Sequence, residues 1–315
     1  MQTHVNLKWT TAGADTSPYA DSVYIDVAQC LSALNRKLVR QGQLFRIRNM
    51  RAYTNDTDPN VTIAVGAIPT TWMTRNAWVK AKALWDEMNA AATEDIGRGN
   101  VYPKWHDFKV FMDVNHRSEH AGASSTDADL MPVSFTDGAI TGGEWEYSKF
   151  ADSGSTSDNY DVHMLGIHSG STGAWNSVGL IQAYAQSRTY PKTDLTANDQ
   201  EVADAIEDSP WALLFGDDDQ TSDVIDNLQA DNDAPPYHQT LYNGGSLGGS
   251  GYKVAITPLQ NLNNKAGGTS LTNIAPSFVA PCGLIRVEID GEASTAGMQG
   301  IHISFDVDIL GPMDM

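Results

Sequence analysis

Two stretches near the C-terminus alternate between apolar and polar residues over most of their length. Residues 284–290 and 301–310 each place an apolar side chain at every second position. A period of two predicts strands with one buried and one solvated face, which is typical of antiparallel sheets. Of these apolar residues, we expect Ile285, Val287, Ile289, Ile303, Phe305 and Val307 in a core, and Ile301 and Ile309 on the same face of the second stretch.

Partners for these two strands must come from earlier in the chain. Residues 44–53 and 61–68 both have strand composition, and we expect them to pair across the polar turn between them. Residues 160–168 and 178–186 are expected to form a second strand pair around a glycine-rich turn. The chain thus consists mainly of short strands separated by turns and loops.

The longest helical pattern runs from about residue 74 to residue 92. Trp78 and Trp85 lie seven residues apart and so share one helical face, which we expect to pack on a sheet. Taken together, the patterns predict an all-β fold, a jelly-roll β-sandwich with long loops and a few short helices. We expect residues 1–315 to form one such domain, with a possible loop-built projecting region at about 116–250.

Charge is distributed unevenly along the chain. The formal net charge is −19, yet residues 1–117 carry 14 Lys/Arg against 11 Asp/Glu, while residues 118–315 carry 6 against 28. A basic part within an acidic chain suggests two surfaces with different duties.

Six basic residues lie close together between residues 36 and 51. If these side chains share one face, they would form a phosphate-binding patch, although they could equally be surface charges paired with the abundant carboxylates. The candidate nucleic-acid-binding residues are Arg36, Lys37, Arg40, Arg46, Arg48 and Arg51.

Two segments match catalytic motifs without the structural context that the chemistry needs. His116-Arg-Ser-Glu-His120 has the H-x-x-E-H spacing of a zinc-protease group, but we expect an exposed loop rather than a helix there. Gly244-Gly-Ser-Leu-Gly248 matches the nucleophile elbow, but a glycine-rich loop follows it where a helix is required. We therefore predict no catalytic residues and a protein that is not an enzyme.

A run of aspartates offers a possible calcium site. Carboxylate oxygens are the ligands that Ca²⁺ prefers, but the spacing does not fit an EF-hand, and acidic residues also favour helix N-termini. The candidate metal residues are Asp217, Asp218, Asp219 and Asp223. No other cofactor is expected.

The cysteines, the N-terminus and the apolar stretches bear on the cellular location of the protein. Cys30 and Cys282 stand far apart, which leaves open whether they form a disulfide. The N-terminus does not read as a signal peptide, and no stretch approaches about 18 consecutive apolar residues, so we expect no membrane insertion.

Two segments resemble capsid proteins of small, often marine, circular single-stranded DNA viruses. They are Ile68-Pro-Thr-Thr-Trp-Met-Thr-Arg-Asn-Ala-Trp78, which leads into Trp85, and Phe278-Val-Ala-Pro-Cys-Gly-Leu-Ile285, which precedes the last strand. One departure is that such proteins often carry an Arg-rich N-terminal arm, whereas residues 1–35 contain a single basic residue, Lys8.

The resemblance implies a structural subunit that self-assembles into an icosahedral virion shell around a genome, with single-stranded DNA as the packaged partner. Two other classes stay open from the residues. One is a carbohydrate-binding or carbohydrate-cleaving β-sandwich that uses exposed Trp and Asp. The other is a surface-layer or adhesive protein stabilised by Ca²⁺.

Overall fold

The computed structural model describes the parts of the chain that build its sheets and most of its helices. These are residues 1–9, 19–54, 60–93, 104–122, 129–134, 138, 140, 142–151, 159–171, 174–189, 254–255, 260–263, 270–291 and 300–313. The chain divides into two compact units, Met1–Tyr184 with Asn243–Met315, and Ala185–Tyr242. The described residues lie almost entirely in the first unit and are predominantly β, as predicted. The projecting region expected at about 116–250 falls largely outside them and stays a prediction.

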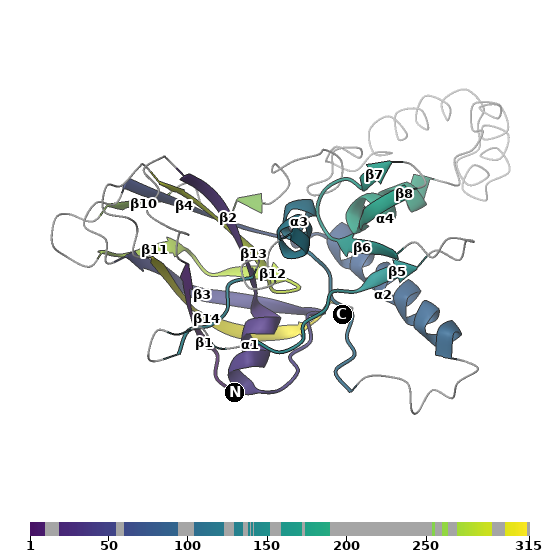
Figure 1. Cartoon of the computed structure of the whole chain (residues 1–315), viewed down its shortest axis with the longest axis horizontal. Helices are drawn as coiled ribbons and strands as arrows, with labels where there is room; N and C mark the ends of the chain where they lie inside the picture. Colours follow the sequence, from purple (N-terminus) through teal and green to yellow (C-terminus); the bar gives the residue numbers. More distant parts are fainter. Residues whose placement is uncertain are drawn as a thin grey trace, which may run out of the picture. The chain divides into compact units, whose positions relative to one another are not determined.

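Two antiparallel sheets contain most of the described strands (Figure 1). The first contains β1 (His4–Trp9), β3 (Gln43–Thr54), β11 (Ser270–Ala275), β12 (Phe278–Pro281) and β14 (Ile301–Pro312). Its order is β1-β14-β3-β11, and β12 also pairs with β3. The second contains β2 (Tyr19–Asp26), β4 (Asn60–Ala67), β9 (Val254–Ala255), β10 (Gln260–Asn263) and β13 (Leu284–Gly291). Its order is β10-β4-β13-β2, and β9 also pairs with β4.

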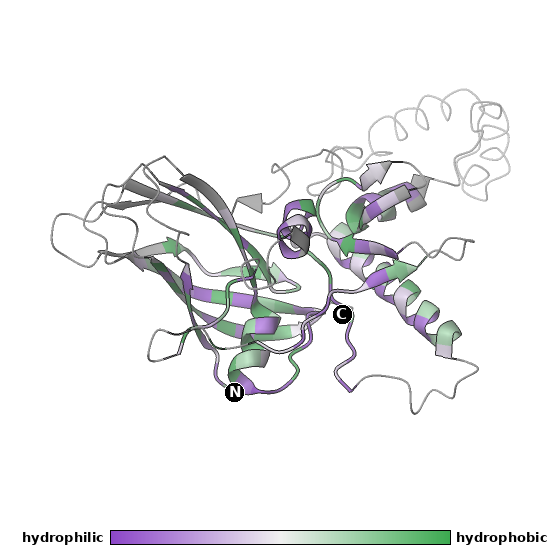
Figure 2. Cartoon of the chain, in the orientation of Figure 1, coloured by the Kyte–Doolittle hydropathy of each residue, from purple (hydrophilic) through white to green (hydrophobic). Residues whose placement is uncertain are grey.

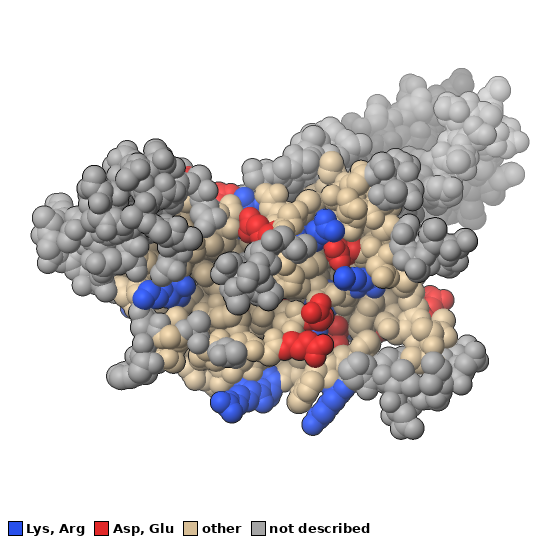
Figure 3. Space-filling model, in the orientation of Figure 1, with Lys and Arg blue, Asp and Glu red and all other residues tan. Residues whose placement is uncertain are grey.

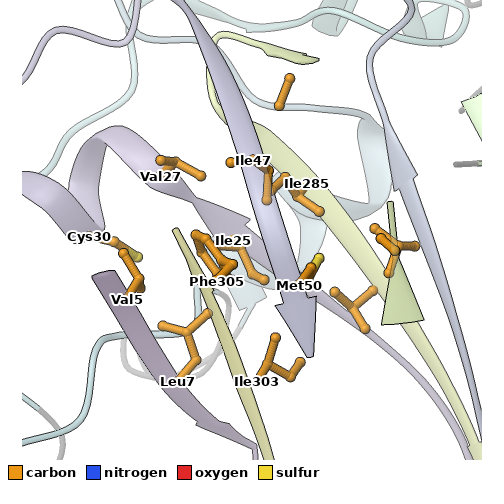
Figure 4. Close-up of a cluster of buried hydrophobic side chains, with 14 of the residues drawn as sticks. Val5, Leu7, Ile25, Val27, Cys30, Ile47, Met50, Ile285, Ile303 and Phe305 are labelled. Atoms are coloured by element: carbon orange, nitrogen blue, oxygen red, sulfur yellow. The ribbon is translucent and has the colours of Figure 1, made fainter. Parts of the chain in front are cut away.

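The two sheets share one apolar core, to which β1, β3 and β14 of the first sheet and β2, β4 and β13 of the second contribute alternate side chains. Phe305 of β14 lies opposite Val5 of β1 in the register and is completely buried, together with Ile47 of β3 and Ile285 of β13 (Figure 4). Figure 2 shows the corresponding alternation of hydrophobic and hydrophilic residues along the strands. The prediction of buried faces at 285–289 and 301–307 is therefore confirmed.

The alternation fails at the end of β14. Ile309 was expected on the same face as Phe305 and Val307, but it is 41% exposed. The pairing of β14 with β3 shifts register between Ile309 and Gly311, so the strand leaves the regular ladder at this point. A register irregularity redirects side chains in a way that the period of two does not reveal.

The expected hairpin between residues 44–53 and 61–68 is wrong. The two segments are strands β3 and β4, but β3 belongs to the first sheet and β4 to the second. β3 instead pairs with β14 along most of its length, and β4 pairs with β13. Each strand has one apolar face, and both faces become buried when the chain crosses between layers rather than turning back in one sheet.

Helix α2 (Trp72–Thr93) confirms the helix predicted at 74–92. Trp78 and Trp85 are buried as expected, but not on a sheet face: both rings contact Phe108, at centroid distances of 5.8 and 5.5 Å. On the other side, Gly42 lies so close to the Trp78 indole that a Cβ would stand 2.4 Å from its nearest ring carbon. Helix α2 thus packs against the 104–111 segment and against the backbone at Gly42, which immediately precedes β3.

The remaining described elements lie between β4 and β9 in sequence, except for the short helix α1 (Val27–Asn35). A third sheet has the order β5-β6-β8-β7, and α3 (Val114–Gly122) precedes it in sequence. Its strands are β5 (Lys149–Ala151), β6 (Asn159–His163), β7 (Ser169–Ser171) and β8 (Ala174–Gly179).

The strand pair predicted from residues 160–168 and 178–186 is wrong in detail. β6 does pair with β8, but the two strands are parallel, and α4 (Leu180–Thr189) occupies most of the second segment. No helix of the described residues is long and apolar enough to span a membrane.

Candidate functional site

The outer face of the first sheet brings together three of the predicted basic residues. Along β3, Phe45 and Ile47 point into the core, so Arg46 and Arg48 are exposed on the opposite face. Continued alternation would bury Arg51.

A β-bulge prevents this. Arg48 pairs with Asp306 and Arg51 with Ser304, so two residues of β3, Asn49 and Met50, stand against one residue of β14. Asn49 adopts a left-handed conformation with φ of 53°, which Asn tolerates better than most residues. The bulge reverses the parity of the strand and returns Arg51 to the face that carries Arg46 and Arg48.

Carboxylates from β14 partly neutralise this face. Arg48 forms an ion pair with Asp308, with Nε 2.8 Å from Oδ2 and Nη2 3.0 Å from Oδ1. Asp306 accepts hydrogen bonds from Asn49 and from His4, and these two bonds lower its pKa. Figure 3 likewise shows acidic side chains close to several of the basic ones on the visible face.

Aromatic rings extend the face toward the start of β14. Tyr53 and His302 are opposite each other in the register and stack with ring centroids 4.6 Å apart and planes only 6° from parallel. His302 pairs with Tyr53 of β3 on one side and with Lys8 of β1 on the other. Guanidinium groups beside half-buried stacked rings combine phosphate-binding and base-stacking chemistry on one surface.

The other predicted basic residues lie elsewhere. Arg36 ends helix α1 in a left-handed conformation, and Lys37 follows it; both are exposed. Arg40 is exposed and forms an ion pair with the buried Asp107 at 3.0 Å, so it holds the 104–111 segment. The structure therefore joins only half of the predicted cluster, and whether any member binds nucleic acid stays a prediction.

The expected loop at the H-x-x-E-H motif is wrong, because the segment is helix α3. Asp113 caps it by accepting a hydrogen bond from the backbone N–H of His116 at 2.8 Å. This cap is what the sequence interpretation missed: a helix of nine residues begins immediately after Asp113.

His116 nevertheless lacks a free nitrogen for a metal. Its ring is fully buried, Nδ1 accepts the backbone N–H of Met112 at 3.0 Å, and Nε2 lies 2.7 Å from Asp129 Oδ1. Because Nδ1 accepts, the proton resides on Nε2, which donates to the carboxylate. Burial lowers the pKa of His116 and the Asp129 carboxylate raises it, with a net upward direction.

Among the described residues, no group of three or more His, Cys, Asp or Glu side chains is arranged to hold a metal ion. The candidate calcium residues, Asp217, Asp218, Asp219 and Asp223, lie outside the described part of the chain, as does the Gly244–Gly248 motif. Cys30 and Cys282 are both buried free thiols.

A buried polar cluster surrounds Asp129. Tyr147 Oη lies 2.9 Å from Asp129 Oδ2 and 3.4 Å from Asp26 Oδ2, so one hydroxyl faces two carboxyl groups. Asp26 Oδ2 also accepts hydrogen bonds from Gln41 Nε2 at 2.9 Å and Trp145 Nε1 at 3.1 Å. The members come from widely separated segments, so no sequence pattern marks them as a group.

The two carboxyl groups of this cluster have opposite titration behaviour. Burial, and then the charge of Asp129, raise the pKa of Asp26 to about 6, against the lowering effect of its N–H donors. Burial alone would raise the pKa of Asp129, but the charge and hydrogen bond of His116 hold it below the ordinary value. Of the pair, Asp26 is therefore the group that takes up a proton first.

No family model, curated protein or solved structure matches this chain. The function must therefore be inferred from the geometry of the fold and from the two segments that resemble capsid proteins, Ile68–Trp78 and Phe278–Ile285.

Proposed function

We propose that the chain is a jelly-roll capsid subunit that self-assembles into a closed virion shell around a nucleic-acid genome. The observation that carries this proposal is the order in which the strands pair. β1 pairs with β14, β2 with β13, β3 with β11 and β12, and β4 with β9 and β10.

This pairing is nested: the first strand meets the last, the second meets the one before it, and so on inward. A nested antiparallel ribbon wrapped into two layers is the arrangement expected of a double Greek key. It supports assignment of β1-β14-β3-β11 and β2-β13-β4-β10 as the two sheets of a jelly roll.

Jelly rolls also occur in lectins and cupins, so topology alone does not separate a shell from a binding protein. Two features favour a shell. First, both capsid-like segments form parts of regular elements of the fold. Ile68–Trp78 contains the start of α2, and Phe278–Ile285 forms β12, the following turn and the start of β13. Second, helices α2 and α3 and the third sheet, all described elements outside the two sheets, offer surface for contacts between subunits.

Particle size tests the proposal directly. A 34.1 kDa chain in a closed shell of about sixty copies would sediment as a particle of about 2 MDa. We expect analytical ultracentrifugation and negative-stain images of the full chain to show such particles under assembly conditions. A monomer or small oligomer across a wide range of salt and pH would contradict the proposal.

A carbohydrate-binding protein is the second candidate, because two large aromatic side chains are open to solvent. Trp105 is 57% exposed and Trp72 is 42% exposed, and exposed indoles are suitable platforms for sugar rings. A monomer or small oligomer that binds glycans, and loses this binding in Trp105→Ala, would favour this alternative.

The third candidate, a calcium-stabilised surface protein, would instead lose thermal stability when calcium is chelated.

For the shell, we propose that the outer face of the first sheet contacts the genome. Arg46, Arg48 and Arg51 supply the positive charge, and Tyr53 with His302 supplies stacked rings at the same surface. Since the whole chain is strongly acidic, binding requires a local surface that outweighs the mean field.

Replacement of both Arg46 and Arg48 with Gln should reduce nucleic-acid binding while leaving the fold intact, because both side chains point away from the core. Each lost phosphate contact lowers the slope of log K against log salt by about 0.7 unit for single-stranded DNA, so the double variant should lose up to about 1.4 units. The slope is measured by titration of single-stranded DNA at several salt concentrations.

A matched control is Lys80→Gln with Lys82→Gln on α2, which removes the same charge from another surface. An unchanged slope in the Arg46/Arg48 variant, or an equal loss in the lysine variant, would contradict a specific role for this face. Because Arg48 already pairs with Asp308, we expect Arg46→Gln alone to give more than half of the effect.

A further inference from the structure

Helix α2 buries one face, and its opposite side carries large apolar side chains as well as charged ones. Leu84 is 48% exposed, Trp72 is 42% exposed and Val79 is 38% exposed. A helix that covers a core normally presents polar and charged side chains to solvent. Three large apolar side chains on the solvent side of one helix therefore make this side a candidate contact surface for another protein.

One row of exposed residues, here called the α2 stripe, runs along the helix in steps of three and four. Residues at this spacing are neighbours on a helix surface. The stripe has small and apolar side chains at its centre and one charge of each sign on either side of that centre. Its members are Asn76, Lys80, Ala83, Leu84, Glu87 and Ala91, all of which are exposed.

The two charges of the α2 stripe, Lys80 and Glu87, form no ion pair with any other residue that the structure describes. The charges beside them are satisfied within the helix, since Lys82 pairs with Asp86. Lys80 and Glu87 are seven residues apart, about 10 Å along the axis, so they do not pair with each other in one helix. Both charges are therefore available to a second molecule.

The order of residues in the α2 stripe is self-complementary for an antiparallel pair of helices. Lys80 lies three residues before Ala83, and Glu87 lies three residues after Leu84, so the charges are equidistant from the centre of the stripe. A two-fold axis through that centre places Lys80 of each helix opposite Glu87 of the other. It also seats each Leu84 on the partner's Ala83, whose small side chain lets the helix axes approach to the short end of about 8–10 Å.

We propose that the α2 stripe is a two-fold contact between two copies of this chain, formed by antiparallel α2 helices. The second copy is the occupant that the charges specify, because a two-fold contact requires a surface that complements itself. The contact needs no closed shell, since a dimer in solution contains the same pair. One pair of helices is smaller than a standard interface of about 1,600 Å², so we expect the dimer to dissociate on dilution.

Cysteine cross-linking of the full chain tests the position and the direction of the pair. The two copies of residue 83 are offset by only about 1.5 Å along the helices, within reach of a disulfide, whereas the two copies of residue 91 are about 22 Å apart. Mild oxidation should therefore give a covalent dimer of Ala83→Cys and none of Ala91→Cys, the matched control on the same stripe. The native thiols of Cys30 and Cys282 are buried. Any other pattern of cross-linking would overturn the proposal.

Charge reversal tests the complementarity, with the dissociation constant measured by sedimentation under conditions in which no particles form. Each dimer contains the Lys80–Glu87 pair twice, so Glu87→Lys should raise the dissociation constant about tenfold, and Lys80→Glu should do the same. The double variant restores both pairs between copies and should return to within about threefold of the original value. It also keeps the net charge of −19, whereas Glu87→Lys reduces the overall repulsion between copies and would by that effect alone strengthen the dimer.

A double variant as weak as either single variant, or an original chain that stays monomeric at the highest soluble concentration, would overturn the contact. The outcome is separate from that for the shell: a dimer without particles supports the contact and contradicts the shell, and particles that tolerate each single reversal do the opposite. Because the Lys80/Lys82 control for DNA binding alters this stripe, its salt slope is measured at concentrations at which every variant is monomeric.

Discussion

Phe305→Ala is expected to lower the free energy of unfolding by about 3–5 kcal/mol, because it removes a ring from the interior and leaves a cavity. Phe305 is completely buried at the centre of β14, between Val5 of β1 and the bulge of β3, in contact with the core shared by both sheets. A close-packed core of this kind relaxes only in part after such a loss. Urea denaturation followed by tryptophan fluorescence measures the change.

Ile309→Ala is the control on the same strand. Its side chain is 41% exposed, so the substitution should cost under about 1 kcal/mol. A near-neutral Phe305→Ala together with a large effect at Ile309 would mean that the faces of β14 are assigned the wrong way round.

Arg286→Met is expected to cost about 2–4 kcal/mol, because it breaks a buried ionic network on the outer face of the second sheet. The Arg286 side chain is 5% exposed and contacts Asp113 at 3.1 Å, Glu288 at 3.2 Å and Ser22 at 2.8 Å. Asp113 is also the cap of α3, so loss of the guanidinium leaves a partly buried carboxylate at the helix start without its cation.

Arg286→Lys separates charge from geometry. Lysine retains the positive charge but presents it as a point, without the planar fork that meets three oxygens at once, so we expect about half of the loss to be recovered. Full destabilisation by Lys would show that the fork alone matters. An Arg286→Met variant as stable as the original chain would show that the network contributes no net stability.

The sequence by itself determined the features that depend on local periodicity. The alternation at residues 285–289 and 301–307 sufficed to identify two strands and their buried faces, and the seven-residue spacing of Trp78 and Trp85 identified α2. These predictions succeed because side-chain direction repeats with a fixed period within one element, so the pattern of burial is encoded in adjacent residues.

Partner choice was decided only in the tertiary structure. β3 and β4 have suitable faces and a short connection, yet they lie in different layers, because β3 pairs with β14 and β4 pairs with β13, both from the far end of the chain. The bulge at Asn49 likewise depends on what stands opposite, and it alone places Arg51 beside Arg46 and Arg48 on the outer face.

The buried cluster shows the same limit most clearly. Asp26, Gln41, Asp129 and Tyr147 each resemble ordinary turn or surface residues in the sequence, and the H-x-x-E-H segment leads into small residues that are typical of a loop. Their hydrogen bonds join four separated stretches of chain. A buried carboxylate is tolerable because such donors satisfy it, and for Asp26 the backbone N–H groups of Ala28 and Gln29 add two local ones. Local sequence specifies which elements form, whereas long-range packing decides which polar groups meet inside them.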